Sequence, residues 1–294
     1  MSVREPSVST APSATPTSSG VSVFVIVLAS IIALVVLAAI FADFIALHPA
    51  DEASLRNRLK PPVWLEGGSW LYPLGTDDLG RDIWSRMIFG ARVSLSVGLF
   101  AVGGAGSIGV ALGLVAGYMG GRTDAVLMRV TDAALAVPLI LVALLFVVTL
   151  GQAFVNVIIA LAILLWSRYT RVIRSEVLSL KERDFVALAR IAGASHLRIM
   201  VRHILPNIMN TTVVLFTLQL GTVILVEASL SFLGAGVPPP TPAWGTMVAD
   251  GRDFTATAWW ISFFPGVAIL VTVLSFNLFG DWLRDRLDPK LRQL

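Results

Sequence analysis

Residues 184–207, DFVALARIAGASHLRIMVRHILPN, form a polar and basic island between two long apolar segments of the chain. Asp184 suits the N-cap of a helix, because its carboxylate can accept hydrogen bonds from the first backbone N–H groups. An apolar stripe follows at helical spacings of three and four residues, formed by Phe185, Leu188, Ala189 and Ala192. Gly193 falls where this helix would stop, since glycine adopts the left-handed conformation at little cost.

Ser195 follows the predicted turn and can cap a second helix over residues 196–205, which Pro206 would end. Two short amphipathic helices at a sharp angle would form a compact protrusion on a membrane face, here called the knob, to which a soluble partner could bind. Amphipathicity alone leaves an alternative open, in which these basic helices lie on the lipid surface as an ordinary loop.

The spacing resembles the EAA loop of ABC-importer permeases, with a Glu-Ala-Ala run, a glycine four residues after its last alanine and an Ile-x-Leu-Pro ending. Three positions depart from that pattern, where Ala187 replaces the glutamate, Leu188 the middle alanine and His203 the isoleucine. The ending RHILPN, residues 202–207, resembles the peptide-permease branch. The resemblance implies an ATPase-coupling surface at nine positions: Asp184, Phe185, Ala187, Leu188, Ala189, Gly193, Ala194, Leu205 and Pro206.

The composition is that of a membrane protein. Of the 294 residues, 56% are hydrophobic and 14% are charged, whereas average soluble chains carry about 25% charged residues. Cysteine is absent, which excludes disulfides and thiolate metal sites, and no metal site is predicted.

Hydropathy along the chain predicts an all-α protein with six membrane-spanning helices. Residues 1–20 are rich in Ser, Thr, Pro and Ala and predict a disordered tail, and residues 21–294 form the transmembrane domain. The expected spans are residues 21–47, 93–119, 131–150 with a kink at Pro138, 154–166, 208–230 and 259–279. A charged segment at residues 48–92 and a basic loop at about 168–206 connect spans.

Six spans place both chain ends on one side of the membrane. That side carries fifteen Lys and Arg residues and the opposite side carries seven. Because cytoplasmic loops carry an excess of positive charge, both termini and the loop at 168–206 are predicted to be cytoplasmic. The segment at residues 48–92 is then extracytoplasmic.

The second predicted span is rich in glycine. Gly109, Gly113 and Gly117 recur every four residues, and small residues let helix backbones approach closely in lipid. We therefore predict a helix-packing face. A nucleotide-binding loop is excluded, because no lysine stands in a Walker A setting anywhere in the chain.

Two further stretches carry a family resemblance. Residues 74–95, LGTDDLGRDIWSRMIFGARVSL, resemble the second membrane subunit of dipeptide and oligopeptide ABC importers, and residues 276–290 resemble the C-terminal end of peptide permeases. From residue pattern alone, the first stretch also predicts an interfacial helix with Asp77 or Asp78 near its N-terminus.

The resemblance implies a type I ABC-importer permease fold in a bacterial cytoplasmic membrane. It implies a heteromeric complex with a related permease, one or two ATPase subunits that hold ATP and Mg, and an extracytoplasmic binding protein. Nucleic acid is not an expected partner. Related permeases carry dipeptides, longer peptides, nickel chelates or other small solutes, and no residue decides among these cargoes.

The sequence offers no catalytic constellation, since no Gly-x-Ser-x-Gly or His-Glu-x-x-His motif occurs. The polar residues within the fifth predicted span are candidates for the transport pathway or its gate: Asn210, Gln219 and Glu227. Glu227 is the only acid deep in a span, and the alternative function is therefore a secondary transporter or channel subunit that uses it. The structural interpretation of Glu227 is that its side chain forms a hydrogen bond to a neighbouring helix and fixes the packing.

Overall fold

The computed structural model of this chain describes residues 23–287, and all of its named elements are helices. The predicted tail at residues 1–20 and the last part of the 276–290 match lie outside the described residues. Five elements are long and apolar enough to cross a membrane: α1 (Val23–Ile40), α3 (Ile83–Met119), α6 (Phe154–Leu180), α9 (Leu205–Phe232) and α11 (Trp260–Leu287). A bent pair, α4 (Gly121–Ala136) and α5 (Leu139–Leu150), supplies a sixth, which confirms the all-helical, six-span prediction.

The structure differs from the prediction at the third span, residues 131–150. The two helices of the bent pair meet at an angle of 86°, and α4 begins at Gly121, where a loop was expected. Val137 is extended, with ψ 133°, because the residue before a proline is disfavoured in the α-helical region. Pro138 therefore breaks the helix rather than kinking it.

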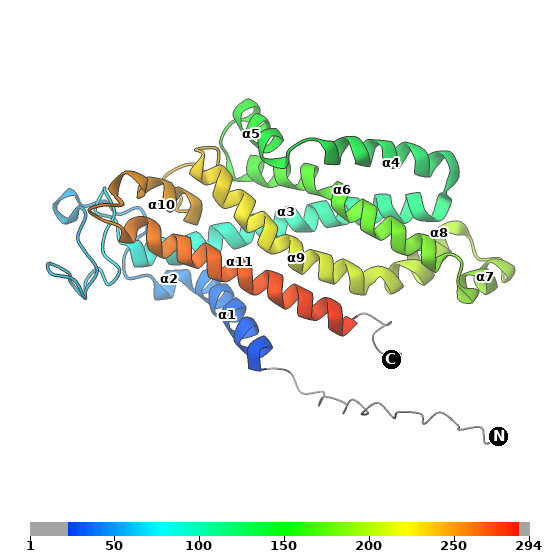
Figure 1. Ribbon diagram of the computed structural model, residues 1–294, viewed down its shortest axis with the longest axis horizontal. Helices are drawn as coiled ribbons and strands as arrows, with labels where there is room; N and C mark the ends of the chain where they lie inside the picture. The colour runs from blue at the N-terminus through cyan, green and yellow to red at the C-terminus, as the bar shows by residue number, and fades with distance from the viewer. Residues whose placement is uncertain (1–22, 288–294) are drawn as a thin grey trace, which may run out of the picture.

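The fourth predicted span was expected to end near residue 166, and the helix that contains it extends further. Helix α6 continues to Leu180, so the start of the basic loop at 168–206 is helical. Charged side chains are tolerated there because they pair with α4, which lies alongside α6 (Figure 1). The pairs are Arg171 with Asp132 and Arg174 with Asp124, the second of them through two nitrogens.

The fifth span has no break before it. Three elements run continuously: α8 (His196–Arg198), a π-helical turn η2 (Ile199–Ile204) and α9. The Leu205 N–H donates to the carbonyl of Met200, five residues back. The helix end predicted at Pro206 is therefore wrong. A proline ring clashes with the carbonyl four residues earlier in a regular helix, and the wider turn before Pro206 relieves that conflict.

Helix α3 is the centre of the packing, and its most extensive partner is α6. A Cβ atom built on Gly109 would stand 2.4 Å from the Cβ of Tyr169, and one on Gly113 would stand 2.8 Å from the Thr170 carbonyl oxygen. At Gly117 the corresponding distance to the Cβ of Val177 is 2.7 Å. No side chain fits at such distances, so the three glycines lie where the two backbones approach each other.

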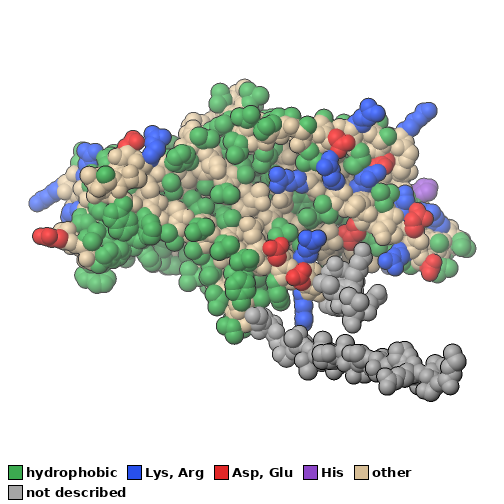
Figure 2. All heavy atoms as spheres, in the orientation of Figure 1, with side chains coloured by type: hydrophobic (Ala, Val, Ile, Leu, Met, Phe, Trp, Pro, Cys, Tyr) green, Lys and Arg blue, Asp and Glu red, His purple; other side chains and the backbone are tan. Residues whose placement is uncertain are grey.

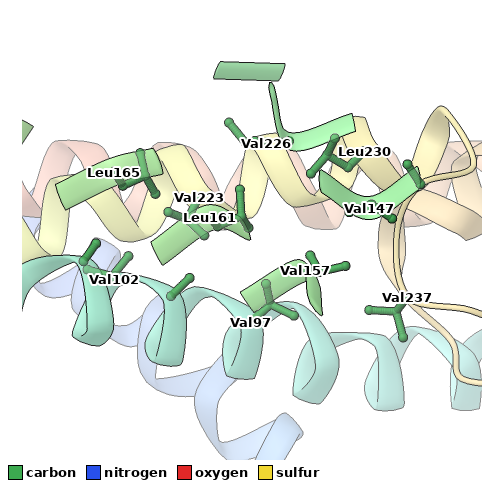
Figure 3. Close-up of a cluster of buried hydrophobic side chains, with 14 of the residues drawn as sticks. Val97, Val102, Val147, Val157, Leu161, Leu165, Val223, Val226, Leu230 and Val237 are labelled. Atoms are coloured by element: carbon green, nitrogen blue, oxygen red, sulfur yellow. The ribbon is translucent and has the colours of Figure 1, made fainter. Parts of the chain in front are cut away.

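Apolar side chains from four helices meet in the main core. Figure 3 shows Val97 and Val102 of α3 facing Val157 and Leu161 of α6, with residues of α9 beside them. On the face that Figure 2 shows, apolar side chains cover much of the middle of the molecule and most charged side chains lie toward its two ends. This distribution is that of a membrane-spanning bundle.

The end of the bundle opposite α7 is built from short elements: α2 (Ala42–Ile45), η1 (Leu55–Asn57), α10 (Trp244–Asp250) and η3 (Arg252–Phe254). Helix α10 lies in a stretch where only a Pro- and Gly-rich loop was expected. It is anchored by Trp244, whose Nε1–H donates to the Met87 carbonyl of α3 at 2.9 Å. Helix α3 begins at Ile83 with Asp82 as its N-cap, so neither Asp77 nor Asp78 caps it.

Candidate functional site

The knob was predicted from two short helices that together reach residue 205. In the structure we call residues 184–198, which hold α7 and α8, the knob, because the chain from Ile199 onward continues into the fifth span. The knob lies at one end of the molecule (Figure 1). Its first helix, α7, spans Asp184–Ile191. Asp184 is not its N-cap, because the extended cap position is occupied by Arg183 and Asp184 is already helical. The carboxylate of Asp184 instead lies in the first turn, where negative charge favours the helix dipole.

Gly193 ends α7 in a left-handed conformation with φ +78°. Its N–H donates to the Arg190 carbonyl at 3.0 Å, and the Ala194 N–H donates to the Ala189 carbonyl at 3.0 Å. This pair of bonds satisfies carbonyls that the helix end would otherwise leave without partners. Ser195 then caps α8, accepting a bond from the Arg198 N–H at 3.4 Å.

One side of the knob packs against the body of the protein. Val186 is fully buried, and it belongs to an apolar cluster with Ile199 and Ile204 of the following turn and with residues of α3 and α6. The Tyr118 hydroxyl at the end of α3 is hydrogen-bonded to Nδ1 of His196 at 2.9 Å. These contacts join the knob to the end of α3 and to the turn that leads into α9.

The other side of the knob presents apolar side chains outward. Phe185 is 37% exposed, Leu188 64% and Ile191 83%, while Ala189 is half-buried. Among the remaining predicted positions, Ala187 and Pro206 are exposed, and Ala194 and Leu205 are half-buried. Three residues of the predicted stripe, Phe185, Leu188 and Ala192, thus face away from the protein, whereas Ala189 packs against the buried cluster. Val186, which the periodicity argument omitted, provides the fully buried contact.

The three polar candidates on α9 do not come together. Asn210 is exposed, whereas Gln219 and Glu227 are buried. Nine residues at about 100° each place Asn210 and Gln219 on opposite faces of the helix. The amide Nε2 of Gln219 has no hydrogen-bond partner among the described residues.

Glu227 is fully buried where α9 crosses α3. The Ser231 hydroxyl, one turn along α9, donates to its Oε1 at 2.7 Å, and the Ser94 hydroxyl of α3 donates to its Oε2 at 3.2 Å. Both carboxyl oxygens are therefore engaged by protein groups. This geometry supports the interpretation of Glu227 as a residue that joins two helices.

We expect Glu227→Gln to preserve uptake, because the amide can accept from Ser231 and donate to Ser94. Glu227→Leu should lower the yield of assembled permease, since two buried hydroxyls lose their partner at a cost of about 1–3 kcal/mol each. The measurement is solute uptake together with the recovered amount of complex. A Glu227→Gln complex that assembles fully and hydrolyses ATP normally but does not transport would assign Glu227 to the pathway instead.

A cluster of buried charges lies at the opposite end of the molecule, and sequence analysis did not identify it as a site. Arg81 Nε contacts Asp77 Oδ2 at 2.7 Å, and Nη2 atoms of Arg81 and Arg86 each lie 3.5 Å from Asp250 Oδ2 of α10. Burial raises the pKa of the Asp250 carboxyl above its ordinary value, although both arginines oppose this shift. The only sequence signal was the density of Asp and Arg ahead of the second span.

Comparison with known proteins identifies the family. Residues 109–293 match the model of the family described as binding-protein-dependent transport system inner membrane component. The chain is 46% identical to the di/tripeptide transport system permease protein DppC of Pseudomonas aeruginosa, over 88% of this chain and 86% of that protein. It is 47% identical to the dipeptide transport system permease protein DppC of Escherichia coli K12, over 89% and 87% of the two chains.

The family match covers more than half of the chain, and the relatives align over most of their own length. They are named as permeases of transport systems, which confirms the resemblance to peptide ABC-importer permeases and excludes an enzyme as the interpretation. The chain therefore belongs to the family of inner membrane components of binding-protein-dependent transport systems, and it is a multi-pass bacterial membrane permease subunit.

Proposed function

We propose that this chain is one of two permease subunits of an ATP-driven importer for dipeptides or short oligopeptides. The observation that carries the cargo class is its 46% identity, over 88% of its length, to a di/tripeptide transport system permease protein. In this proposal a related permease completes the pathway, an extracytoplasmic binding protein delivers the peptide, and one or two ABC ATPases bind ATP and Mg.

The knob is the proposed attachment point for an ATPase subunit. Three large apolar side chains, Phe185, Leu188 and Ile191, are exposed on a basic, polar end of the molecule rather than in its apolar middle. Apolar anchors surrounded by polar groups are typical of protein interfaces. Because Val186 and His196 tie the knob to α3 and α9, movement of the ATPase would be passed to the spans.

The proposed orientation places the knob and both chain ends in the cytoplasm. It is supported by the excess of Lys and Arg on that side. ATP binding would bring the two ATPases together, move the knobs and open the pathway to the outside, as in two-state alternating access.

The proposal is tested with Leu188→Asp, since a charge at an exposed apolar anchor should detach the ATPase without disturbing the permease. We expect co-purification of the ATPase and ATP-dependent uptake of a labelled dipeptide to fall about tenfold or more, which corresponds to roughly 1.4 kcal/mol of lost binding. Leu188→Met is the matched control, because it keeps an apolar side chain of similar volume.

Uptake should also vanish when the Walker A lysine of the partner ATPase is replaced. Dipeptide uptake that persists in that background and follows the proton gradient would contradict the proposal and favour a secondary transporter. Normal attachment and uptake in Leu188→Asp would contradict the assignment of the knob.

A further inference from the structure

The cluster of buried charges at the end of the bundle opposite the knob borders a cavity of about 220 Å³. Arg81, just before α3, and Arg86, in the first turn of α3, line it together with Asp250 of α10 and Ser231 of α9. Thr241, in the connection between α9 and α10, also lines the cavity and is exposed. Side chains from three elements that are distant in sequence thus converge on one space.

Arg86 is buried, and its two carboxylate partners lie at the long end of the ion-pair range. It is only 3% exposed, and its Nη1 has no hydrogen-bond partner within the described part of the chain. Its Nε lies 3.5 Å from Asp77 Oδ2 and its Nη2 lies 3.5 Å from Asp250 Oδ2, whereas charge-assisted hydrogen bonds usually measure about 2.7–2.9 Å. A buried donor that lacks an acceptor is costly, so the free Nη1 makes the site suited to an additional hydrogen-bond acceptor such as a carboxylate oxygen.

The position of Asp250 shows where that acceptor would enter. Its carboxylate is 38% exposed and lies 3.5 Å from one Nη2 atom of each arginine, so it pairs with both of them only loosely. Arg81 is held more firmly from the other side by Asp77 at 2.7 Å. The guanidinium group of Arg81 is therefore fixed from one side, and those of both arginines are loosely paired on the side that Asp250 occupies.

We propose that this cavity binds the terminal carboxylate of a peptide as it enters the permease. A planar guanidinium matches a carboxylate through two parallel hydrogen bonds. The cavity is smaller than the usual ligand pocket of about 300–1,000 Å³, so it fits the end of a peptide rather than a whole one. Its wall continues through Ser231 to Glu227 at the crossing of α3 and α9. This inference rests on the proposed function for its ligand class.

The test uses the natural absence of cysteine in the chain. The variant Thr241→Cys, in the assembled transporter in nanodiscs without the binding protein, is labelled with a maleimide in the presence of Ala-Ala or its C-terminal amide. We expect Ala-Ala to slow labelling about tenfold once the site is roughly nine-tenths occupied, and the amide to have no effect. Glu66→Cys, exposed and outside the cavity, is the control whose labelling should not change.

Two substitutions added to the Thr241→Cys variant test which side chains bind the peptide carboxylate. Arg81→Gln should raise the half-protecting concentration of Ala-Ala about tenfold or more, because a charge-assisted hydrogen bond is lost. Asp250→Asn should lower that concentration about tenfold, since it removes a like-charged carboxylate that occupies the arginines. A gain of this kind cannot result from misfolding, so it remains decisive if Arg81→Gln fails to assemble.

Equal protection by Ala-Ala and its amide, or no protection by either, overturns the carboxylate site. If the peptide gives no protection but added binding protein does, the carboxylate site is also overturned, and the arginines are assigned to docking of the binding protein. The uptake assay tests the proposed function separately. If the complex imports Ala-Ala but the peptide does not protect Thr241→Cys, the carboxylate site is rejected and peptide import is retained. Selective protection without uptake would retain the carboxylate site and contradict peptide import.

Discussion

Gly109→Ala in α3 is expected to abolish the assembled permease. The added Cβ would lie 2.4 Å from the Cβ of Tyr169 and 2.5 Å from the carbonyl oxygen of Trp166 in α6. Because a backbone atom and a Cβ cannot rotate away, α3 and α6 must separate along the most extensive contact of the fold. Overpacking of this kind costs about 1–3 kcal/mol, and occasionally more.

Gly103→Ala is the matched control on the same helix, because a Cβ at Gly103 meets no atom within 4 Å. It should leave the yield unchanged or raise it, since alanine favours a helix by about 1 kcal/mol relative to glycine. The measurement is the amount of monodisperse complex and its thermal stability in detergent. Equal yields for the two variants would show that α3 and α6 do not pack as described.

Gly193→Val should uncouple the transporter while leaving its membrane-spanning part intact. Gly193 has φ +78°, a conformation that costs other residues roughly 1–2 kcal/mol and is most unfavourable for a β-branched side chain. A Cβ there meets no atom within 4 Å, so any effect must come from the backbone. Loss of the turn would misdirect α8 relative to α7, and we expect uptake to fall about tenfold or more.

Gly193→Asn separates this backbone effect from the mere presence of a side chain, because asparagine tolerates the left-handed region. It should retain most of the uptake and of the attached ATPase. Membrane insertion should be normal in both variants. Full uptake in Gly193→Val would reject the role of this turn in coupling.

Much of the fold follows from local sequence. Uninterrupted apolar stretches predict membrane spans because burying charge in lipid is costly, and the structure contains six such spans when the bent pair is counted as one. The turn at Gly193 and the cap at Ser195 were also predictable, since each depends on the conformation or hydrogen bonding of a few adjacent residues. The close approach of α3 to α6 was signalled by glycines at intervals of four.

Other features required the packed structure. The periodicity of α7 predicted an apolar stripe but not its direction, and only the packing of Val186 and Ala189 against the cluster with α3 and α6 shows that most of the stripe faces outward. Pro206 was expected to end a helix, yet the preceding π-helical turn lets the chain continue into α9. The rule that proline ends a helix assumes regular α-helical hydrogen bonding, and it does not anticipate a π-helical turn.

The charged end of the bundle also combines features that the sequence predicts with features that only the packed structure reveals. The sequence alone determined that Arg81, Arg86 and Asp77 lie ahead of an apolar span, and with it that they lie near a membrane boundary. Only the tertiary structure decided that Asp250, far along the chain, lies beside the two arginines at a cavity, and that the Nη1 of buried Arg86 has no hydrogen-bond partner among residues 23–287. Local patterns specify spans and turns because these depend on neighbours in sequence. Pairing and burial depend on residues that meet only after α3, α9 and α10 have packed.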